Sequence, residues 1–423
     1  MSFPAGFLWG ASTAAYQVEG GNRRSAFWDW ERRHGWEPCG PAVNSWEMWR
    51  DDLRCLQQLN LRAYRFSVEW SRVEPYPGDF DEAALERYLE MARALNRAGI
   101  RPIVCLHHFS EPVWLFERYP KGWLSSGAAD EFIRFTNRVV LALRTEVRDW
   151  ITFNEPMVWL LYGYGMGRFP PGMRRILSLE RTFYRDGLLG NVLRAHNEAY
   201  RIIHRDVDGA RVAVVQNVTD LEPARPGAAD LEAMGAWDRF MHGKFLDMAH
   251  GSGALDFLGL NYYTRIYVRA SRVPGMPWGA LPAYAELEET LGPRLFRWLG
   301  GRRGDRPRTD MGWEIVPEGL GRVVGRLWEA YRLPILVTEN GIANASGERR
   351  EDFLREHLRS LLAAIQTGAK VEGYLHWSLL DNYEWGSFKP KFGLFRVNRK
   401  KDFRRMLALG GRYYAQVARR NAL

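Results

Sequence analysis

Cysteine is scarce in this chain of 423 residues. Its three cysteines, Cys39, Cys55 and Cys105, are too few for a disulfide framework and lack the paired spacing of a zinc site. We therefore expect reduced, buried thiols and no metal ion. No Walker loop, HExxH helix or GxSxG turn occurs either, so the sequence implies no cofactor.

Long hydrophobic runs are also missing. No stretch of 18 apolar residues is present, which excludes a membrane-spanning helix of ordinary length. The first residues, Met1 to Gly6, do not show a charged segment followed by an apolar one, so we expect no signal peptide. These two absences predict a cytoplasmic protein without a membrane partner.

The charge is moderately basic. Lys and Arg number 59 against 50 Asp and Glu, which gives a formal net charge of +9. Because the basic residues are spread along the chain, we interpret them as a solvated surface rather than a nucleic-acid site. Binding to nucleic acid or to an anionic membrane stays open as the alternative. With 46% hydrophobic and 26% charged residues, the composition is that of an ordinary globular protein.

Short, almost continuously apolar segments alternate with segments of helical periodicity. Buried parallel strands have this continuous pattern, and eight of them suffice to close a barrel. We predict an α/β fold, a (β/α)8 TIM barrel, as one catalytic domain over residues 1–423; an open doubly wound sheet is the alternative. Long loops are expected at 162–190 and 265–308. The predicted strands are Phe7–Thr13, Ala63–Trp70, Arg101–Phe109, Trp150–Pro156, Arg211–Val218, Asp256–Thr264, Pro334–Ile342 and Val371–Leu380.

Two glutamates end predicted strands. Glu155 ends the fourth strand and Glu339 the seventh, and in a barrel both would face the same cavity. Cleavage of an acetal needs such a pair, because one carboxyl group protonates the leaving oxygen and the other attacks or stabilises the cationic centre. Arg65, on the second strand, would keep one of them ionised, while burial without a cation would favour the protonated form of the other.

Either glutamate alone could be a helix cap or an ion-pair partner. Their companions favour a sugar site, because amides and imidazoles bind sugar hydroxyls and indole faces stack on pyranose rings. The companions at the other strand ends and in the loops that follow them are Gln17, His107, His108, Asn154, Asn261, Tyr263, Trp377, Glu384 and Trp385.

The chain resembles the family 1 glycoside hydrolases, the β-glucosidase and β-galactosidase type, over nearly its whole length. The most specific segments are Thr152-Phe153-Asn154-Glu155-Pro156 and Val337-Thr338-Glu339-Asn340-Gly341. Further matches are Phe7-Leu8-Trp9-Gly10-Ala11-Ser12, Tyr64-Arg65-Phe66-Ser67, Gly259-Leu260-Asn261-Tyr262-Tyr263, Thr309-Asp310-Met311-Gly312-Trp313-Glu314, and residues 377–385, which read WSLLDNYEW.

This resemblance implies a retaining double displacement on a small β-glycoside. Glu155 would be the general acid and base and Glu339 the nucleophile, with carboxyl groups roughly 5–5.5 Å apart. Arg65 and Tyr263 would contact Glu339, and Asn261 is assigned to support the pair.

The same resemblance implies the groups that bind the substrate. Asn154 would bond the sugar 2-hydroxyl, and Trp313 would form a wall for the leaving group. Gln17, His108, Glu384 and Trp385 would hold the remaining hydroxyls above a floor formed by Trp377. A carboxylate at Glu384 would repel a phosphate, which favours an unphosphorylated sugar.

Three departures from the family pattern leave the sugar undecided. Phe109 stands where many relatives have Trp, the segment between Trp385 and Phe392 is about one residue short, and the segment after the first strand is abbreviated. Glucose, galactose and fucose configurations stay open. So do transglycosylation to an alcohol acceptor and a carbohydrate-binding pseudoenzyme, although both glutamates are present. The sequence does not predict an oligomeric state.

Overall fold

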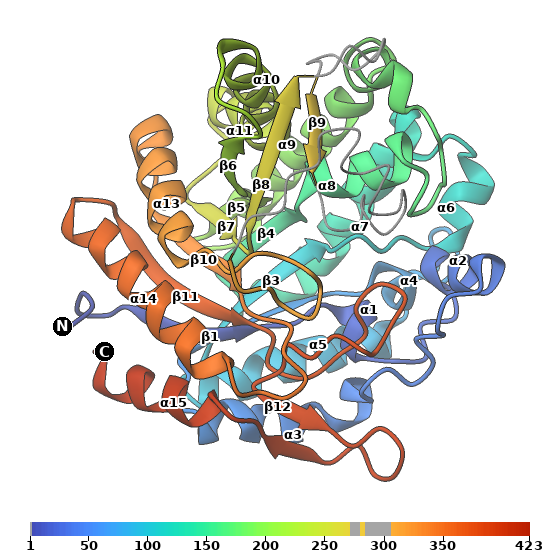
Figure 1. Ribbon diagram of the computed structural model, residues 1–423. Coiled ribbons are helices and arrows are strands. Elements are labelled where there is room, and N and C mark those ends of the chain that lie inside the picture. The colour runs from blue at the N-terminus through green and yellow to red at the C-terminus, as the bar shows by residue number, and fades with distance from the viewer. Residues whose placement is uncertain (1, 271–279, 284–305) are drawn as a thin grey trace.

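Eight parallel strands form a closed barrel at the centre of the molecule (Figure 1). The computed structural model describes residues 2–270, 280–283 and 306–423. Around the barrel the strands follow one another in chain order, and β1 pairs with both β2 and β11. The barrel strands are β1 (Leu8–Ser12), β2 (Ala63–Ser67), β3 (Arg101–His107), β4 (Asp149–Asn154), β5 (Arg211–Asn217), β7 (Leu258–Asn261), β10 (Ile335–Asn340) and β11 (Val371–Trp377).

The strands are buried on both faces, as their continuous apolar pattern predicts. Small and branched side chains such as Ala63, Ile103, Ile151, Ala213 and Leu336 form a cluster separate from the main core. Side chains of this kind fill the interior of a β/α barrel, while the opposite face of each strand packs against helices. The barrel is therefore a packed core, and its chemistry is left to the strand ends.

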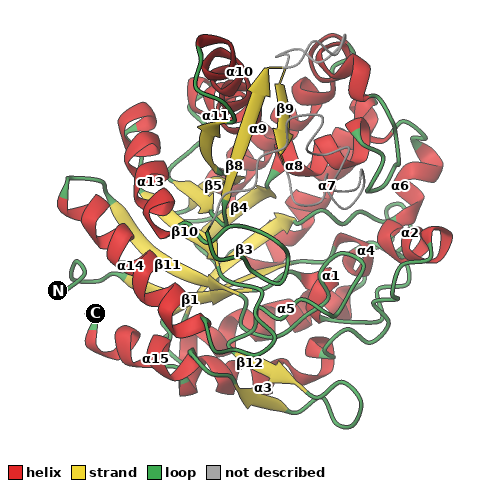
Figure 2. Ribbon diagram, viewed as in Figure 1, coloured by secondary structure: helices red, strands yellow, loops and turns green. Residues whose placement is uncertain are grey.

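Helices form a ring outside the strands (Figure 2). Helix α7 illustrates the predicted periodicity, since Phe132, Phe135, Val139 and Leu143 are all fully buried. One helix of this outer ring follows each barrel strand. These helices are α3 (Ser45–Gln58), α5 (Glu82–Arg97), α7 (Ser126–Leu143), α9 (Leu188–Asp206), α11 (Lys244–Gly251), α13 (Pro317–Tyr331), α14 (Arg350–Gln366) and α15 (Gly411–Arg420).

Further elements lie in the connections between the barrel strands and the outer helices. The additional helices are α1 (Ala15–Val18), α2 (Ala26–His34), α4 (Trp70–Val73), α6 (Val113–Arg118), α8 (Pro156–Leu160) and α10 (Ala228–Asp238), with single helical turns at Gly122–Leu124 and Arg239–Gly243. Two small sheets accompany them, β12 (Phe395–Val397) with β13 (Arg405–Leu407), and β6 (Asp220–Pro223) with β8 (Arg265–Ala270) and β9 (Ala280–Ala283).

The predicted fold class is confirmed, and the predicted strands correspond to the eight barrel strands. The second and fourth predicted strands were too long at their C-terminal ends, because Trp70 and Pro156 already begin the helices α4 and α8. Both predictions of long loops were wrong where the structure describes them. Residues 162–190 contain helical turns at 161–165, 176–178 and 181–185 and the start of α9. Residues 265–308 contain β8 and β9, while 271–279 and 284–305 lie outside the described residues.

Candidate active site

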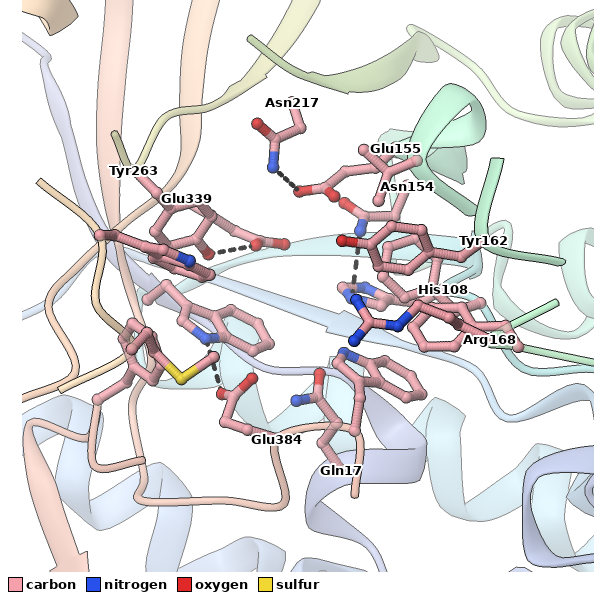
Figure 3. Close-up of a pocket in the computed structure, with 18 of the residues that line it drawn as sticks. Gln17, His108, Asn154, Glu155, Tyr162, Arg168, Asn217, Tyr263, Glu339 and Glu384 are labelled. Carbon is pink, nitrogen blue, oxygen red and sulfur yellow. Dashed lines mark hydrogen bonds between the residues drawn. The ribbon is translucent and has the colours of Figure 1, made fainter. Parts of the chain in front are cut away.

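Glu155 and Glu339 come from β4 and β10, whose carboxyl ends open on one cavity (Figure 3). Glu155 follows directly after β4 and has left-handed backbone angles, φ 46° and ψ 56°. This conformation is uncommon for a residue with a side chain and costs on the order of 1 kcal/mol. Pro156 then occupies the first turn of α8, where its missing N–H is tolerated. The sharp turn directs the carboxyl group of Glu155 into the cavity.

Glu339 is held by donors on both of its carboxyl oxygens. The Arg65 guanidinium donates to Oε1, and the Tyr263 hydroxyl donates to Oε2 at 2.6 Å. Arg65 is fully buried and its only ion pair among the described residues is with Glu339. A guanidinium and a phenol hydroxyl that both donate to one carboxyl group stabilise negative charge on it.

Glu155 lies in a different electrostatic environment. Its Oε1 accepts from Asn261 Nδ2 at 2.7 Å and from Asn217 Nδ2 at 3.1 Å, and no cationic side chain among the described residues donates to it. Burial, together with the nearby charge of Glu339, raises the pKa of Glu155 from 4.5 to about 8, and the two amide donors oppose this rise. At neutral pH most molecules therefore carry a proton on Glu155.

Hydrogen bonds through Asn154 connect the two carboxyl groups. Arg65 Nη2 donates to Asn154 Oδ1 at 2.6 Å, and Asn261 Nδ2 donates to the same oxygen at 3.2 Å. Asn154 Nδ2 in turn lies 3.2 Å from His108 Nε2. These hydrogen bonds restrict the side chains of both glutamates and of Asn154 before substrate arrives.

The cavity has a volume of about 380 Å³. Ten of the thirteen residues that the sequence pointed to line it. Arg65 and Asn261 lie behind its wall in contact with the two glutamates. His107 does not line the cavity; its Nε2 lies 3.1 Å from Glu111 Oε1, so it is a buried partner of that carboxyl group. The ten are Gln17, His108, Asn154, Glu155, Tyr263, Trp313, Glu339, Trp377, Glu384 and Trp385.

Three of the polar groups that line the cavity away from the two glutamates, Gln17, His108 and Glu384, are uncharged at neutral pH, whereas Arg168 adds a guanidinium to the lining. Trp377 Nε1 donates to Glu384 Oε1 at 3.1 Å, but burial raises the pKa of Glu384 to about 8. Burial and the charge of Arg65 lower the pKa of His108 well below 6.5, so its ring is neutral. Gln17 and Glu384 lie together at the bottom of Figure 3. Neutral groups that both donate and accept are suited to sugar hydroxyls.

Aromatic rings form other parts of the wall. Trp313 packs against Tyr263 and Phe392, with ring centroids 5.4 and 6.2 Å apart. The ring of Trp377 is stacked near that of His108, at 6.0 Å. Phe109 lines the cavity with an apolar ring and has a left-handed backbone, φ 68°.

Asn217 is a polar lining residue at a strand end that was not predicted from the sequence. It ends β5, the fifth barrel strand, so the rule that chemistry gathers at strand ends was sufficient to find it. The remaining missed lining residues come from loops and short helices, where no periodic signal marks them. They are Trp36, Val158, Tyr162, Arg168, Phe169, Met311 and Phe392.

The described residues contain no group of three His, Cys, Asp or Glu side chains that could hold a metal ion. All three cysteines are free and buried. Within the same part of the chain, no helix combines the length and the apolar composition needed to cross a membrane.

In this closed β/α barrel, two buried carboxyl groups face a sugar-sized cavity. One of them is paired with a guanidinium, and among the described residues the other accepts only from neutral amides. This combination defines a glycoside hydrolase. Comparison with known proteins identifies the family. The sequence pattern of glycosyl hydrolase family 1 matches residues 1–254 and 247–423. The chain belongs to this family.

Relatives of known activity and of known structure agree with this assignment. The chain is 30% identical over 473 residues to β-glucosidase A of Thermotoga maritima, covering 100% of this chain and 98% of that protein. It is 32% identical over 444 residues to a bifunctional β-D-glucosidase/β-D-fucosidase of Bifidobacterium breve, covering 94% of each. The solved structure of a β-glycosidase from Pyrococcus horikoshii superposes with a TM-score of 0.88 and 33% identity, over 99% of this chain and 95% of that one.

Proposed function

We propose that this chain is a retaining exo-β-glycosidase that releases one sugar, foremost a β-D-glucosyl residue, from the non-reducing end of a small β-glycoside. We further propose that residues 1–423 act as one catalytic unit. The observation that carries the proposal is the contrast between the two glutamates. Glu339 has a guanidinium and a hydroxyl as donors, whereas Glu155 has two neutral amides and a pKa raised to about 8.

This contrast assigns the roles in the first step. A carboxyl oxygen of Glu339 attacks the anomeric carbon while the bond from that carbon to the leaving oxygen breaks. The leaving oxygen takes the proton of Glu155, which becomes a carboxylate. A covalent glycosyl-enzyme and a free alcohol result. Tyr263 and Arg65 steady the attacking carboxylate.

In the second step water replaces the sugar on Glu339. Glu155, now ionised, accepts a proton from water as the oxygen bonds to the anomeric carbon. The bond to Glu339 breaks and the carboxylate is restored. Two inversions give net retention of configuration. An alcohol in place of water would give transglycosylation, and analysis of the products formed with added alcohol distinguishes the two outcomes.

The walls of the cavity support recognition of a single neutral sugar. Asn154, beside both glutamates, is placed for the 2-hydroxyl, and the uncharged groups Gln17, His108 and Glu384 are placed for the others. Glu384 would repel a phosphorylated sugar once its carboxyl group is ionised, and no lysine among the described residues lines the cavity, where Arg168 is the cationic side chain. Names among the relatives include β-glucosidase, β-galactosidase and β-D-fucosidase, so all three configurations are tested first.

The free, buried cysteines support the prediction of a reducing, cytoplasmic location. A location outside the cytoplasm would not alter the chemistry proposed for the site.

The roles are tested with two variants and two kinds of leaving group. Glu339→Ala should lower kcat on nitrophenyl β-D-glucoside by roughly 10³-fold or more, because the nucleophile is lost. Glu155→Ala should impair alkyl glucosides far more than dinitrophenyl glucosides, because an activated phenol leaves without a proton. The control is Glu232→Ala, an exposed glutamate of α10, which should retain the parent rates.

Equal losses for good and poor leaving groups in Glu155→Ala would remove this residue from the acid role. Tight sugar binding without turnover by the parent protein would instead favour the pseudoenzyme.

A further inference from the structure

We propose that Asn217 is a positioning residue that, together with Asn261, confines the catalytic proton of Glu155 to one carboxyl oxygen, Oε2. This inference rests on the proposed role of Glu155 as acid and base. It concerns a residue at the end of β5 whose side chain points toward Glu155 in Figure 3.

The directions of the hydrogen bonds made by Asn154 and Asn261 follow from Arg65. A guanidinium has only donors, so the atom of Asn154 that faces Arg65 Nη2 at 2.6 Å is its carbonyl oxygen, Oδ1. Asn261 approaches this oxygen at 3.2 Å and must do so with its NH₂ group. The Thr338 hydroxyl donates to Asn261 Oδ1 at 2.7 Å, which fixes the same orientation.

The second hydrogen of that NH₂ group is directed at Glu155. Asn261 Nδ2 lies 2.7 Å from Glu155 Oε1, so Oε1 accepts a hydrogen bond there and does not donate one. Asn217 Nδ2 approaches the same oxygen at 3.1 Å. A carboxyl oxygen has two lone-pair directions in the plane of the group, and two amide donors occupy both. The proton of the acid form is therefore left to Oε2.

This arrangement suits both chemical steps. In the first step, the proton on Oε2 passes to the leaving oxygen while the two amides stabilise the charge that develops on the carboxylate. In the second step, Oε2 is the oxygen without amide donors and accepts the proton of water. Without Asn217, one lone pair of Oε1 becomes free, and the proton can also be placed there, where it is of no use to the leaving group.

The side chain of Asn217 contacts fewer residues of the site than that of Asn261. Asn261 also bonds Asn154 and Thr338, so its loss would disturb the nucleophile side of the site. The side chain of Asn217 makes one hydrogen bond within the described part of the chain, the one to Glu155. Its backbone pairs with β7 through the register Asn217↔Asn261, which does not involve the side chain. A substitution at Asn217 therefore isolates its effect on the acid.

The test compares Asn217→Ala and Asn217→Asp with the parent enzyme. An amide donor to the carboxylate stabilises the ionised form, so its removal should raise the pKa of Glu155. We expect the alkaline limb of kcat/KM to move up by about half to one pH unit in Asn217→Ala. In Asn217→Asp it should move further in the same direction, because a negative charge is added beside Glu155.

A second readout is the dependence on the leaving group. Misplacement of the proton should lower kcat/KM for an alkyl glucoside roughly tenfold in Asn217→Ala and leave a dinitrophenyl glucoside within about threefold. The matched control is Asn96→Ala, because Asn96 Nδ2 also donates to a glutamate, Glu146 at 3.0 Å, but outside the site. That variant should leave both the pH profile and the rate ratio unchanged.

An unmoved alkaline limb in both variants, or equal losses for the two leaving groups, would overturn the inference. A shift to lower pH in Asn217→Asp would overturn it as well. Failure of the proposed function is recognised separately, because Glu155→Ala would then show no dependence on the leaving group. Melting temperatures of both variants show whether the compared proteins are folded. If Asn217→Ala unfolds, Asn217→Asp is used alone, because it keeps the size of the side chain.

Discussion

Glu155 and Glu339 are the same residue type in two environments, and the difference has a cost in stability. A buried carboxyl group whose pKa is raised binds its proton more tightly in the folded than in the unfolded protein. For Glu155 the rise is from 4.5 to about 8, caused by burial and by the charge of Glu339. The stabilisation from this tighter proton binding is fully present below pH 4.5. It is lost as the pH rises through 8.

Replacing Glu155 with a neutral side chain should therefore stabilise the fold most at high pH. We expect Glu155→Gln to raise the free energy of unfolding by roughly 1–3 kcal/mol at pH 8, and to be nearly neutral at pH 4.5. Urea unfolding at several pH values measures the difference. The control Glu232→Gln is on an exposed residue of α10 and should show no such trend. A difference between variant and parent that does not change with pH would contradict the linkage.

Individual site residues could be predicted from the sequence where they lie at the ends of barrel strands. Asn154, Glu155 and Glu339 follow from the positions at which buried apolar segments stop, and Asn217 was available by the same rule. Residues such as Trp36 reach the cavity only because a loop folds back over it. No periodic pattern in the sequence indicates that the loop folds back over the cavity, so Trp36 could not be predicted as a lining residue.

Between elements, the approach of β10 to β11 shapes the floor of the cavity. Gly341 follows β10, and a Cβ atom placed on it would lie 1.8 Å from the carbonyl oxygen of Trp377, the last residue of β11. Because the atom in contact is a backbone oxygen, the overlap could be relieved only by a shift of the end of β11. The close contact therefore requires glycine and fixes the position of the Trp377 indole.

Gly341→Ala should push the end of β11 away and displace Trp377. We expect a loss of roughly 10- to 100-fold in kcat/KM and about 1–3 kcal/mol in the free energy of unfolding. The matched control is Gly325→Ala in α13, where a Cβ atom would have no neighbour within 4 Å. In a helix interior that change should stabilise by about 0.5–1 kcal/mol. Parent-like activity in Gly341→Ala would show that the strand end is not held by this contact.

Element types were predictable where one periodicity runs through a buried segment, as in β3 and α7. The prediction failed in 162–190 and at the start of 265–308, where Pro, Gly and Arg indicated loops. Short helical turns and the strand β8 form there because they pack on neighbours distant in sequence. Residues Asp220–Pro223 pair with Arg265–Val268, for example. Such pairings override weak local preferences.

At the scale of the whole molecule, the barrel is completed by the two ends of the chain, which lie close together in Figure 1. The Tyr414 hydroxyl of α15 lies 2.7 Å from the carbonyl oxygen of Gly10 and 3.0 Å from that of Tyr374, and its one hydrogen is shared between these two acceptors. It thus joins β1 and β11, the first and last strands of the barrel. Apolar residues of α15 such as Val417 pack against the main core.

Asn421 makes the most polar contacts between the two ends. Its Oδ1 accepts from the Trp9 indole at 2.9 Å, and its Nδ2 donates to the carbonyl oxygens of Phe3 and Pro4, each at 3.0 Å. Its backbone is left-handed, with φ 51°, a conformation that Asn tolerates better than most residues. The residue therefore ends α15 and ties the N-terminal segment to it.

Asn421→Ala should weaken this closure without touching the active site. The variant loses three hydrogen bonds, leaves the Trp9 indole without its acceptor and adds backbone strain, so we expect the free energy of unfolding to fall by roughly 2–4 kcal/mol. Asn421→Gly separates the causes, because glycine removes the same hydrogen bonds but accepts the left-handed backbone; it should lose about 1 kcal/mol less than alanine. Urea unfolding measures both variants, and kcat/KM at 25 °C should match the parent. If neither variant moves the unfolding midpoint, contact between the termini does not limit the stability of the barrel.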